Sequence, residues 1–215
     1  MGTFVVIESS DAAGGSTQTD LLVKRIKKSG YTPHQFHFPQ EDEPTGQIIY
    51  GKFLRAKNKG HFSKREQALL YVQDFYSRSK EFFAIIDSGK KNVIVSDRYC
   101  TSTMVYQTAG MSGKIRKKMM AWLTWLAWED EPRLPRPDLV IFLDIPVEVA
   151  LERLKSKKVD YHERRDMLLR FRRSYLRLAK EQGWVTVNAV DAKGESRSRE
   201  DIHEDIWQIT RKTIT

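Results

Sequence analysis

The sequence predicts an α/β fold in which a mainly parallel sheet is covered on both faces by helices. Short apolar runs rich in Val and Ile alternate along the chain with longer segments of helical periodicity. Gly30 and Gly89 fall just beyond two of these helical segments, where glycine commonly ends a helix. No internal repeat and no linker rich in Pro, Gly or Ser divides the 215 residues, so we expect a single domain over residues 1–215.

Each strand is predicted from its apolar core and from what bounds it. The first contains the run from Phe4 to Ile7 and is followed by a loop of small residues, and the second is followed by Pro39. A proline-rich segment, residues 131–137, leads into the fourth strand, and we interpret it as a rigid connection. The expected strands are residues 4–8, 34–38, 92–96, 139–143 and 184–188. The expected helices are residues 16–29, 46–56, 64–88, 114–129, 147–156, 161–181 and 199–212, with a further helix after residue 99.

Composition indicates a globular protein, with 40% hydrophobic and 30% charged residues. One cysteine, Cys100, excludes a disulfide framework within the chain and favours a reducing, cytoplasmic setting. No basic and then apolar leader is visible, and no run approaches about 18 apolar residues, so we expect neither secretion nor a membrane partner.

The net charge of +9 raises the hypothesis of a nucleic-acid-binding module. Most basic residues are interleaved with acids, however, and the clusters at 155–158 and 164–165 suit a polyphosphate as well as DNA. Acidic residues at the expected ligand edge of the sheet, namely Asp11, Asp97 and Asp144, also disfavour a groove for a phosphate backbone. We therefore expect no nucleic-acid partner.

The loop after the first strand has the length of a phosphate-binding loop. The template for nucleoside triphosphates is GxxxxGK[ST], whose backbone N–H groups and following helix N-terminus bind an anion. In the window from Ser9 to Ser16, Gly14 and the hydroxyl of Ser16 match the template, whereas Ser9 replaces its first glycine and Gly15 its lysine. A small-residue turn between a strand and a helix, with no ligand, is the alternative interpretation.

A carboxylate and a guanidinium follow the third strand. Asp97 could hold Mg²⁺ and Arg98 could bind a phosphate with two hydrogen bonds, or the two could form a structural ion pair. Because ligands of open parallel sheets bind beyond the carboxyl ends of the strands, we expect Asp97 and Arg98 to face the loop after the first strand.

The order of these motifs along nearly the whole chain resembles the thymidylate kinase family. The shared features are Glu8 with the following loop, Phe38-Pro39, Asp97-Arg98-Tyr99, Ser102 with Tyr106-Gln107, and the run from Pro137 to Pro146. The resemblance implies a three-layer P-loop NTPase fold with a five-stranded sheet and a short lid at about residues 155–165. It also implies transfer of the γ-phosphoryl group of ATP to dTMP, with Mg²⁺, in a homodimer.

The resemblance also implies roles for individual residues. For the donor ATP, these are Ser10, Asp11, Ala12, Ala13, Gly14, Gly15, Ser16, Thr17 and Arg153, with Ser16 and Asp97 as metal ligands. For the acceptor nucleotide, they are Asp11, Phe38, Pro39, Tyr71, Phe75, Arg98, Ser102, Tyr106 and Gln107. Phe75 stands where the family usually has an arginine that reads thymine, and Arg78 could reach in from one turn later.

Loss of the loop lysine leaves two hypotheses about activity. In the first, other cations stand in for the lysine, so that Asp97, Arg98 and the lid residues Arg164 and Arg165 carry out phosphoryl transfer. In the second, the chain binds nucleotides and has weak or no kinase activity because residue 15 is glycine. A stripe of Trp122, Trp125 and Trp128 predicts a helix face that lies in the core or in a dimer interface.

Overall fold

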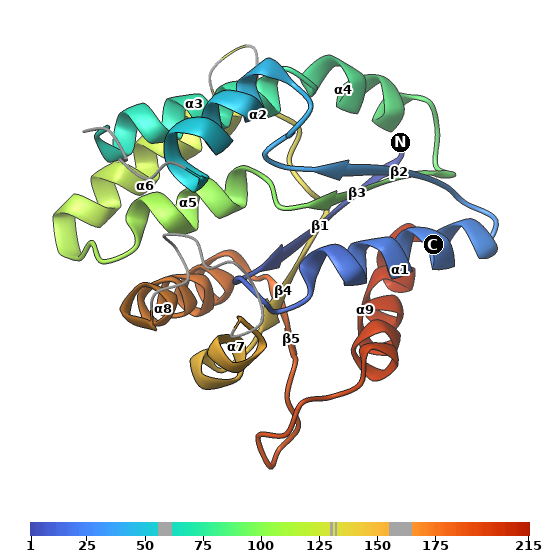
Figure 1. Cartoon of the computed structure of the whole chain (residues 1–215). Coiled ribbons are helices and arrows are strands. Elements are labelled where there is room, and N and C mark those ends of the chain that lie inside the picture. The colour runs from blue at the N-terminus through green and yellow to red at the C-terminus, as the bar shows by residue number, and fades with distance from the viewer. Residues whose placement is uncertain (56–61, 130, 132, 155–164) are drawn as a thin grey trace.

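The computed structural model describes residues 1–55, 62–129, 131, 133–154 and 165–215. These residues contain a five-stranded sheet in the order β2-β3-β1-β4-β5, in which every neighbouring pair is parallel. The strands are β1 (Thr3–Ser9), β2 (Thr32–His37), β3 (Asn92–Asp97), β4 (Leu139–Asp144) and β5 (Val185–Asn188). The predicted α/β fold with its parallel sheet is confirmed, and β1 lies at its centre (Figure 1).

Helices cover both faces of the sheet and make three layers (Figure 1). They are α1 (Gly15–Lys28), α2 (Pro44–Ile49), the π-helix η1 (Tyr50–Leu54), α3 (Lys64–Tyr76), α4 (Ser79–Asp87), α5 (Cys100–Thr108), α6 (Gly113–Trp128), α7 (Val147–Leu154), α8 (Arg165–Gln182) and α9 (Arg199–Ile214). Among the described residues, no helix combines the length and the apolar character that crossing a bilayer requires.

Successive side chains of β1 enter two different core layers, one on each face of the sheet. Phe4 and Val6 pack with the apolar faces of α3 to α6 and of α8, whereas Val5 and Ile7 pack with α1 and α9. Because successive side chains of a strand point to opposite faces, a strand buried on both sides reads as a continuous apolar run. The carboxyl ends of β1, β2 and β3 are thereby fixed side by side at one edge of the sheet.

The segment 64–88 forms two helices, so the prediction of one helix was wrong. The first ends at Tyr76 and the second begins at Ser79. At the break, the hydroxyl of Ser77 donates to the carbonyl of Asp74 (2.7 Å) and that of Ser79 to the carbonyl of Tyr76 (2.9 Å). Serine hydroxyls compete in this way with the helical hydrogen-bond ladder.

Two further boundaries differ from the prediction. The helix expected over 46–56 begins at Pro44, and its second half is the π-helix η1. The helix expected over 161–181 is described from Arg165 onward, whereas 155–164, with most of the expected lid, lies outside the described residues.

The tryptophans of α6 have different environments. Trp128 is buried in the core and Trp125 is 45% exposed. Trp122 is partly buried, and the guanidinium carbon of Arg65 lies 5.0 Å from its ring centroid. The stripe is therefore divided between core and surface, and the homodimer stays a prediction.

Candidate functional site

A cavity of about 640 Å³ opens at the carboxyl ends of β1, β2 and β3. Walls come from the loop after β1 and from α3, α5 and α8. The predicted site residues that line it are Ser10, Asp11, Ala12, Gly14, Gly15, Ser16, Thr17, Phe38, Pro39, Tyr71, Phe75, Asp97, Arg98, Ser102, Tyr106 and Gln107. Ala13, Arg78, Arg153 and Arg165 are not among the described residues of the lining, and Arg164 lies outside the described part of the chain.

The loop after β1 turns back on itself before α1 begins. Ala12 and Gly14 both adopt left-handed backbone conformations, with φ of 64° and 96°. The N–H of Ala13 donates to the carbonyl of Ser10 (3.2 Å), and the Ala13 side chain is buried in the core. Because the first N–H groups of a helix have no intrahelical partner, the start of α1 at Gly15 brings unpaired donors and a positive dipole end to the cavity.

The two departures from the phosphate-loop template lie next to each other. A β-carbon on Gly15 would come closer than 3.0 Å to the Oγ of Ser9 and within 3.2 Å of the Ser9 Cβ. The same β-carbon would lie 3.2 Å from Oδ1 of Asp97. Ser9 thus fills the space that a side chain at position 15 would need.

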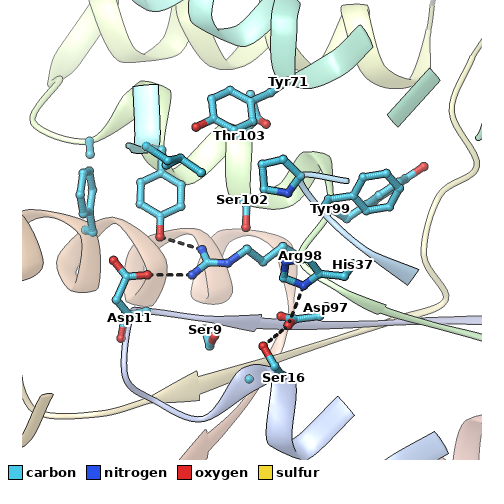
Figure 2. Close-up of a pocket in the computed structure, with 18 of the residues that line it drawn as sticks. Ser9, Asp11, Ser16, His37, Tyr71, Asp97, Arg98, Tyr99, Ser102 and Thr103 are labelled. Carbon is cyan, nitrogen blue, oxygen red and sulfur yellow. Dashed lines mark hydrogen bonds and ion pairs between the residues drawn. The ribbon is translucent and has the colours of Figure 1, made fainter. Parts of the chain in front are cut away.

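Asp97 is buried at the end of β3 and joins two other elements (Figure 2). Its Oδ2 accepts a hydrogen bond from the Ser16 hydroxyl (2.5 Å) and lies 3.0 Å from Nδ1 of His37. Burial alone would raise the pKa of Asp97, but the hydrogen bond with His37, the charge of Arg98 and the hydrogen bond from Ser16 together hold this pKa below its ordinary value.

Ser16 and Asp97 fit the role of magnesium ligands. A hydroxyl oxygen and a carboxylate oxygen stand side by side, and Mg²⁺ prefers oxygen ligands, commonly one or two carboxylates completed by substrate phosphates. The described residues contain no cluster of three or more His, Cys, Asp or Glu side chains that could hold a metal ion. Water and phosphate oxygens would complete the coordination.

Arg98 spans the cavity between α5 and the loop after β1 (Figure 2). Its Nη1 donates to the hydroxyl of Tyr106 and its Nη2 to Oδ1 of Asp11, both at 2.8 Å. Burial alone would lower the pKa of Arg98, but the oxygens of Tyr106, Tyr175, Asp11 and Asp97 raise it well above its ordinary value, so the guanidinium stays charged. Burial also raises the pKa of Tyr106 to about 12, which keeps its hydroxyl protonated.

Glu8 lies beneath the cavity and was not predicted as a site residue. It is fully buried and accepts hydrogen bonds from the hydroxyls of Thr101 (2.5 Å), Ser102 and Tyr175 (3.0 Å). Burial raises the pKa of Glu8, although the three hydroxyls and Arg98 act in the opposite direction. Because Ser102 also lines the cavity, Glu8 fixes the position of one side chain of the cavity wall.

Three basic residues of the lining were also missed by sequence reasoning. His37 ends β2, Lys64 begins α3 and Arg170 comes from α8. Lys64 donates to the carbonyl of Tyr106 (2.9 Å), and burial together with the charge of Arg170 lowers its pKa. The serine before Lys64 caps α3, which marks a helix start, but no local pattern in the sequence shows that this start faces a cavity.

Arg78 does not take the place of an arginine at position 75. It sits at the break between α3 and α4, where Nη2 pairs with Glu81 (2.6 Å) and Nη1 lies 3.8 Å from Glu43. Phe75 lines the cavity and packs against Phe38, with ring centroids 4.8 Å apart.

Arg153 and Arg165 do not line the cavity in the described part of the chain. Nη1 of Arg153 donates to the carbonyl of Ala12 (3.1 Å) and Nη2 to the hydroxyl of Ser196 (3.2 Å). Arg153 therefore supports the backbone of the loop from outside. Arg165 is exposed and pairs with Glu148 of α7 (3.2 Å).

The fold and the position of the cavity define a class. A parallel sheet with this strand order, a loop of small residues that leads from the central strand into a helix, and a cavity beyond the strand ends make up the P-loop NTPase fold.

Comparison with known proteins narrows the class to a family. The sequence model described as "Thymidylate kinase" matches residues 7–206. The "Probable thymidylate kinase" of Thermococcus gammatolerans is 34% identical over 100% of this chain and 98% of its own length, and that of Thermococcus onnurineus is 33% identical over 98% of both chains. The solved structure of thymidylate kinase from Candida albicans has the same fold, with a TM-score of 0.79 over 100% of this chain and 94% of its own, at 21% identity. The chain belongs to the thymidylate kinase family.

Proposed function

We propose that the protein is a nucleoside monophosphate kinase that transfers the γ-phosphoryl group of ATP to dTMP, giving dTDP and ADP. The observation that carries this proposal is the bridge from Asp11 through Arg98 to Tyr106, which joins the loop after β1 to the α5 wall of the same cavity. The guanidinium of Arg98, fixed in position at two nitrogens, is suited to bind one phosphate group. The loop after β1, together with the N-terminus of α1, is suited to bind another phosphate group.

Residues on the loop side would bind the donor. Unpaired N–H groups at the start of α1 would receive the polyphosphate of ATP, and Arg153 would keep the loop in shape through the carbonyl of Ala12. Ser16 and Asp97 would hold Mg²⁺, which neutralises charge on the phosphates and orients them when it is bound.

Residues beyond β3 would bind the acceptor. Arg98 would hold the phosphate of dTMP, and the side chains of α3 and α5 that line the cavity would enclose its base. These are Tyr71, Phe75, Ser102, Tyr106 and Gln107. Phosphoryl transfer needs little covalent help from a protein, so positioning the two nucleotides and supplying positive charge would be the main tasks. Arg164 and Arg165 stay proposed sources of that charge, and Arg165 would have to leave Glu148 to act.

A second candidate is a nucleotide-binding protein with weak or no kinase activity. Gly15 favours this candidate, because a loop without its lysine lacks one positive charge beside the transferred group. Loss of a fixed charge partner of this kind typically costs about 100- to 1000-fold in rate.

ADP formation from ATP and Mg²⁺ tests the proposal when it is measured separately with dTMP, dCMP, dAMP and dGMP. We expect turnover with dTMP that falls at least about 100-fold in the Asp97→Asn variant. Calorimetry with ATP and Mg²⁺ distinguishes the second candidate: binding of ATP without turnover of any of the four acceptors would reject the kinase and leave the binding protein.

A further inference from the structure

Space, and not backbone conformation, restricts residue 15. Gly15 is not among the glycines with positive φ, so its backbone accepts any L-amino acid. It is also the first residue of α1, a position that tolerates most side chains. The obstacle is Ser9, whose Oγ would lie closer than 3.0 Å to a β-carbon on residue 15.

Ser9 cannot move aside easily. It is buried, with 4% of its surface exposed, and its backbone pairs with Leu143 in the parallel ladder between β1 and β4. A change of rotamer could swing the Oγ away, but the Ser9 Cβ would still lie 3.2 Å from the new β-carbon. Oδ1 of Asp97 would also lie 3.2 Å from this β-carbon. Close-packed protein interiors leave little room for such contacts.

We infer that Ser9 is the residue that excludes a side chain at position 15, so that this loop regains a lysine only when residue 9 changes too. In the GxxxxGK[ST] template the first glycine stands where Ser9 stands. Without a β-carbon there, the template leaves room for the lysine stem. The two departures of this loop are thus one coupled change, in which a serine hydroxyl occupies the volume released by the lost lysine.

The coupling between residues 9 and 15 affects how the loop would bind the polyphosphate of a nucleotide. Beside Asp97 the loop presents backbone N–H groups and the Ser16 hydroxyl, with no cationic side chain at position 15. The positive charge that the template places on the loop would have to come from the metal that accompanies the nucleotide or from other cations around the cavity. This consequence rests on the proposed function, whereas the packing of Ser9 against position 15 does not.

A double-mutant cycle of thermal unfolding tests the packing alone. Gly15→Ala should lower the melting temperature by about 3 °C or more in the presence of Ser9, because the added β-carbon is overpacked. In the Ser9→Gly background the same Gly15→Ala change should lower the melting temperature by at least about 2 °C less, because only the 3.2 Å contact with Oδ1 of Asp97 remains and because alanine restricts the unfolded chain more than glycine does. A smaller loss, or a gain, in the Ser9→Gly background is the expected result.

Gly51→Ala is the matched control. Gly51 is also helical, has no positive φ and would place its β-carbon in open space, so this change should have the same effect in the wild type and in the Ser9→Gly background. If Ser9→Gly fails to fold, the Ser9→Ala background, which removes only the Oγ, gives the second comparison. Equal effects of Gly15→Ala across the backgrounds that fold would overturn the inference.

Calorimetry with ATP and Mg²⁺ tests the functional half. Gly15→Lys alone should weaken ATP binding or unfold the protein, whereas Ser9→Gly with Gly15→Lys should bind ATP at least about tenfold more tightly than the wild type. If the double variant binds more tightly and no variant turns over an acceptor, the proposed kinase fails and the inference stands. If Gly15→Lys alone binds as tightly as the double variant, the inference fails.

Discussion

The two sides of the cavity are built in different ways. At the end of β3, side chains from separate elements hold one another: Arg98 joins Asp11 to Tyr106, and Asp97 joins Ser16 to His37. The loop after β1 contributes Asp11 and Ser16 to these contacts, but its other groups at the cavity are small side chains and the unpaired N–H groups at the start of α1. Any substitution other than one to proline removes a side chain and leaves the peptide N–H in place. Single substitutions should therefore cost most at the β3 end.

Arg98→Gln is expected to have the largest effect. Loss of the guanidinium removes the charge proposed to hold the acceptor phosphate, so kcat/KM for dTMP should fall about 100- to 1000-fold. Arg133→Gln is the control, because Arg133 is exposed and pairs only with Glu131 of the same surface segment among the described residues. An Arg98→Gln enzyme within about fivefold of the wild type would remove Arg98 from the proposed mechanism.

Arg153→Gln should act on the donor side and should cost less. Its contact with the carbonyl of Ala12 supports a loop that keeps its backbone N–H groups, so we expect the KM for ATP to rise about tenfold with a smaller change in kcat. Ser196→Ala, which removes the other partner of Arg153 among the described residues, should have little effect. A loss of activity as large as that of the Arg98→Gln variant would contradict the expectation that substitutions at the β3 end of the cavity cost more than those on the loop side.

Glu8 and Asp97 should give opposite dependences of stability on pH. The pKa of Glu8 is raised, so its contribution to the free energy of unfolding is complete below the ordinary value of 4.5 and is lost as the pH rises through the folded-state pKa. The pKa of Asp97 is lowered, so its contribution is present above 3.8 and is lost as the pH falls through the folded-state pKa.

Urea unfolding from about pH 3 to about pH 8, a range that spans the ordinary carboxyl pKa values, measures both dependences. Relative to wild type, Glu8→Gln should gain stability as the pH rises, and Asp97→Asn should gain stability as the pH falls. Two slopes of the same sign would show that these carboxyl groups do not experience opposite environments.

Arg165→Ala is expected to have the smallest effect, a loss of turnover of a few fold. Arg165 is exposed and paired with Glu148, and exposed pairs contribute about 0–1 kcal/mol to stability, so folding should not change measurably. Glu148→Ala is the matched control, since it frees Arg165 without removing a cation. Unchanged turnover in the Arg165→Ala variant would contradict the hypothesis that Arg165 supplies positive charge for phosphoryl transfer.

The strands were predictable because they depend on local apolar runs. The edge of the sheet that carries the candidate site was predictable because all strands were expected to be parallel. Apolar runs set β1, β3 and β4, and the parallel arrangement then brought Asp97 and Arg98 to the phosphate loop. The break at Ser77 was not predictable from periodicity, because apolar spacing continues through it while two serine hydroxyls bond to the backbone. The low helix propensity of serine reflects this competition but does not locate the break.

Contacts between residues that are distant in the sequence were also not predicted. Glu8 was noted as part of a motif, but its three hydroxyl partners come from α5 and α8, and sequence spacing does not reveal them. Arg78 shows the opposite error. Its position one turn after Phe75 predicted that it would reach the cavity, but Glu81 and Glu43 hold it elsewhere. Side-chain direction depends on partners that only the fold identifies.

The ion pair between Asp11 and Arg98 has a consequence for the choice of acceptor. A ligand that binds the guanidinium competes for it with a carboxylate that already pairs with it at 2.8 Å. A phosphate group brings about two negative charges to that exchange, whereas an uncharged nucleoside brings none. If Arg98 holds the acceptor as proposed, we expect Asp11 to act as an internal competitor that favours phosphorylated acceptors over free nucleosides.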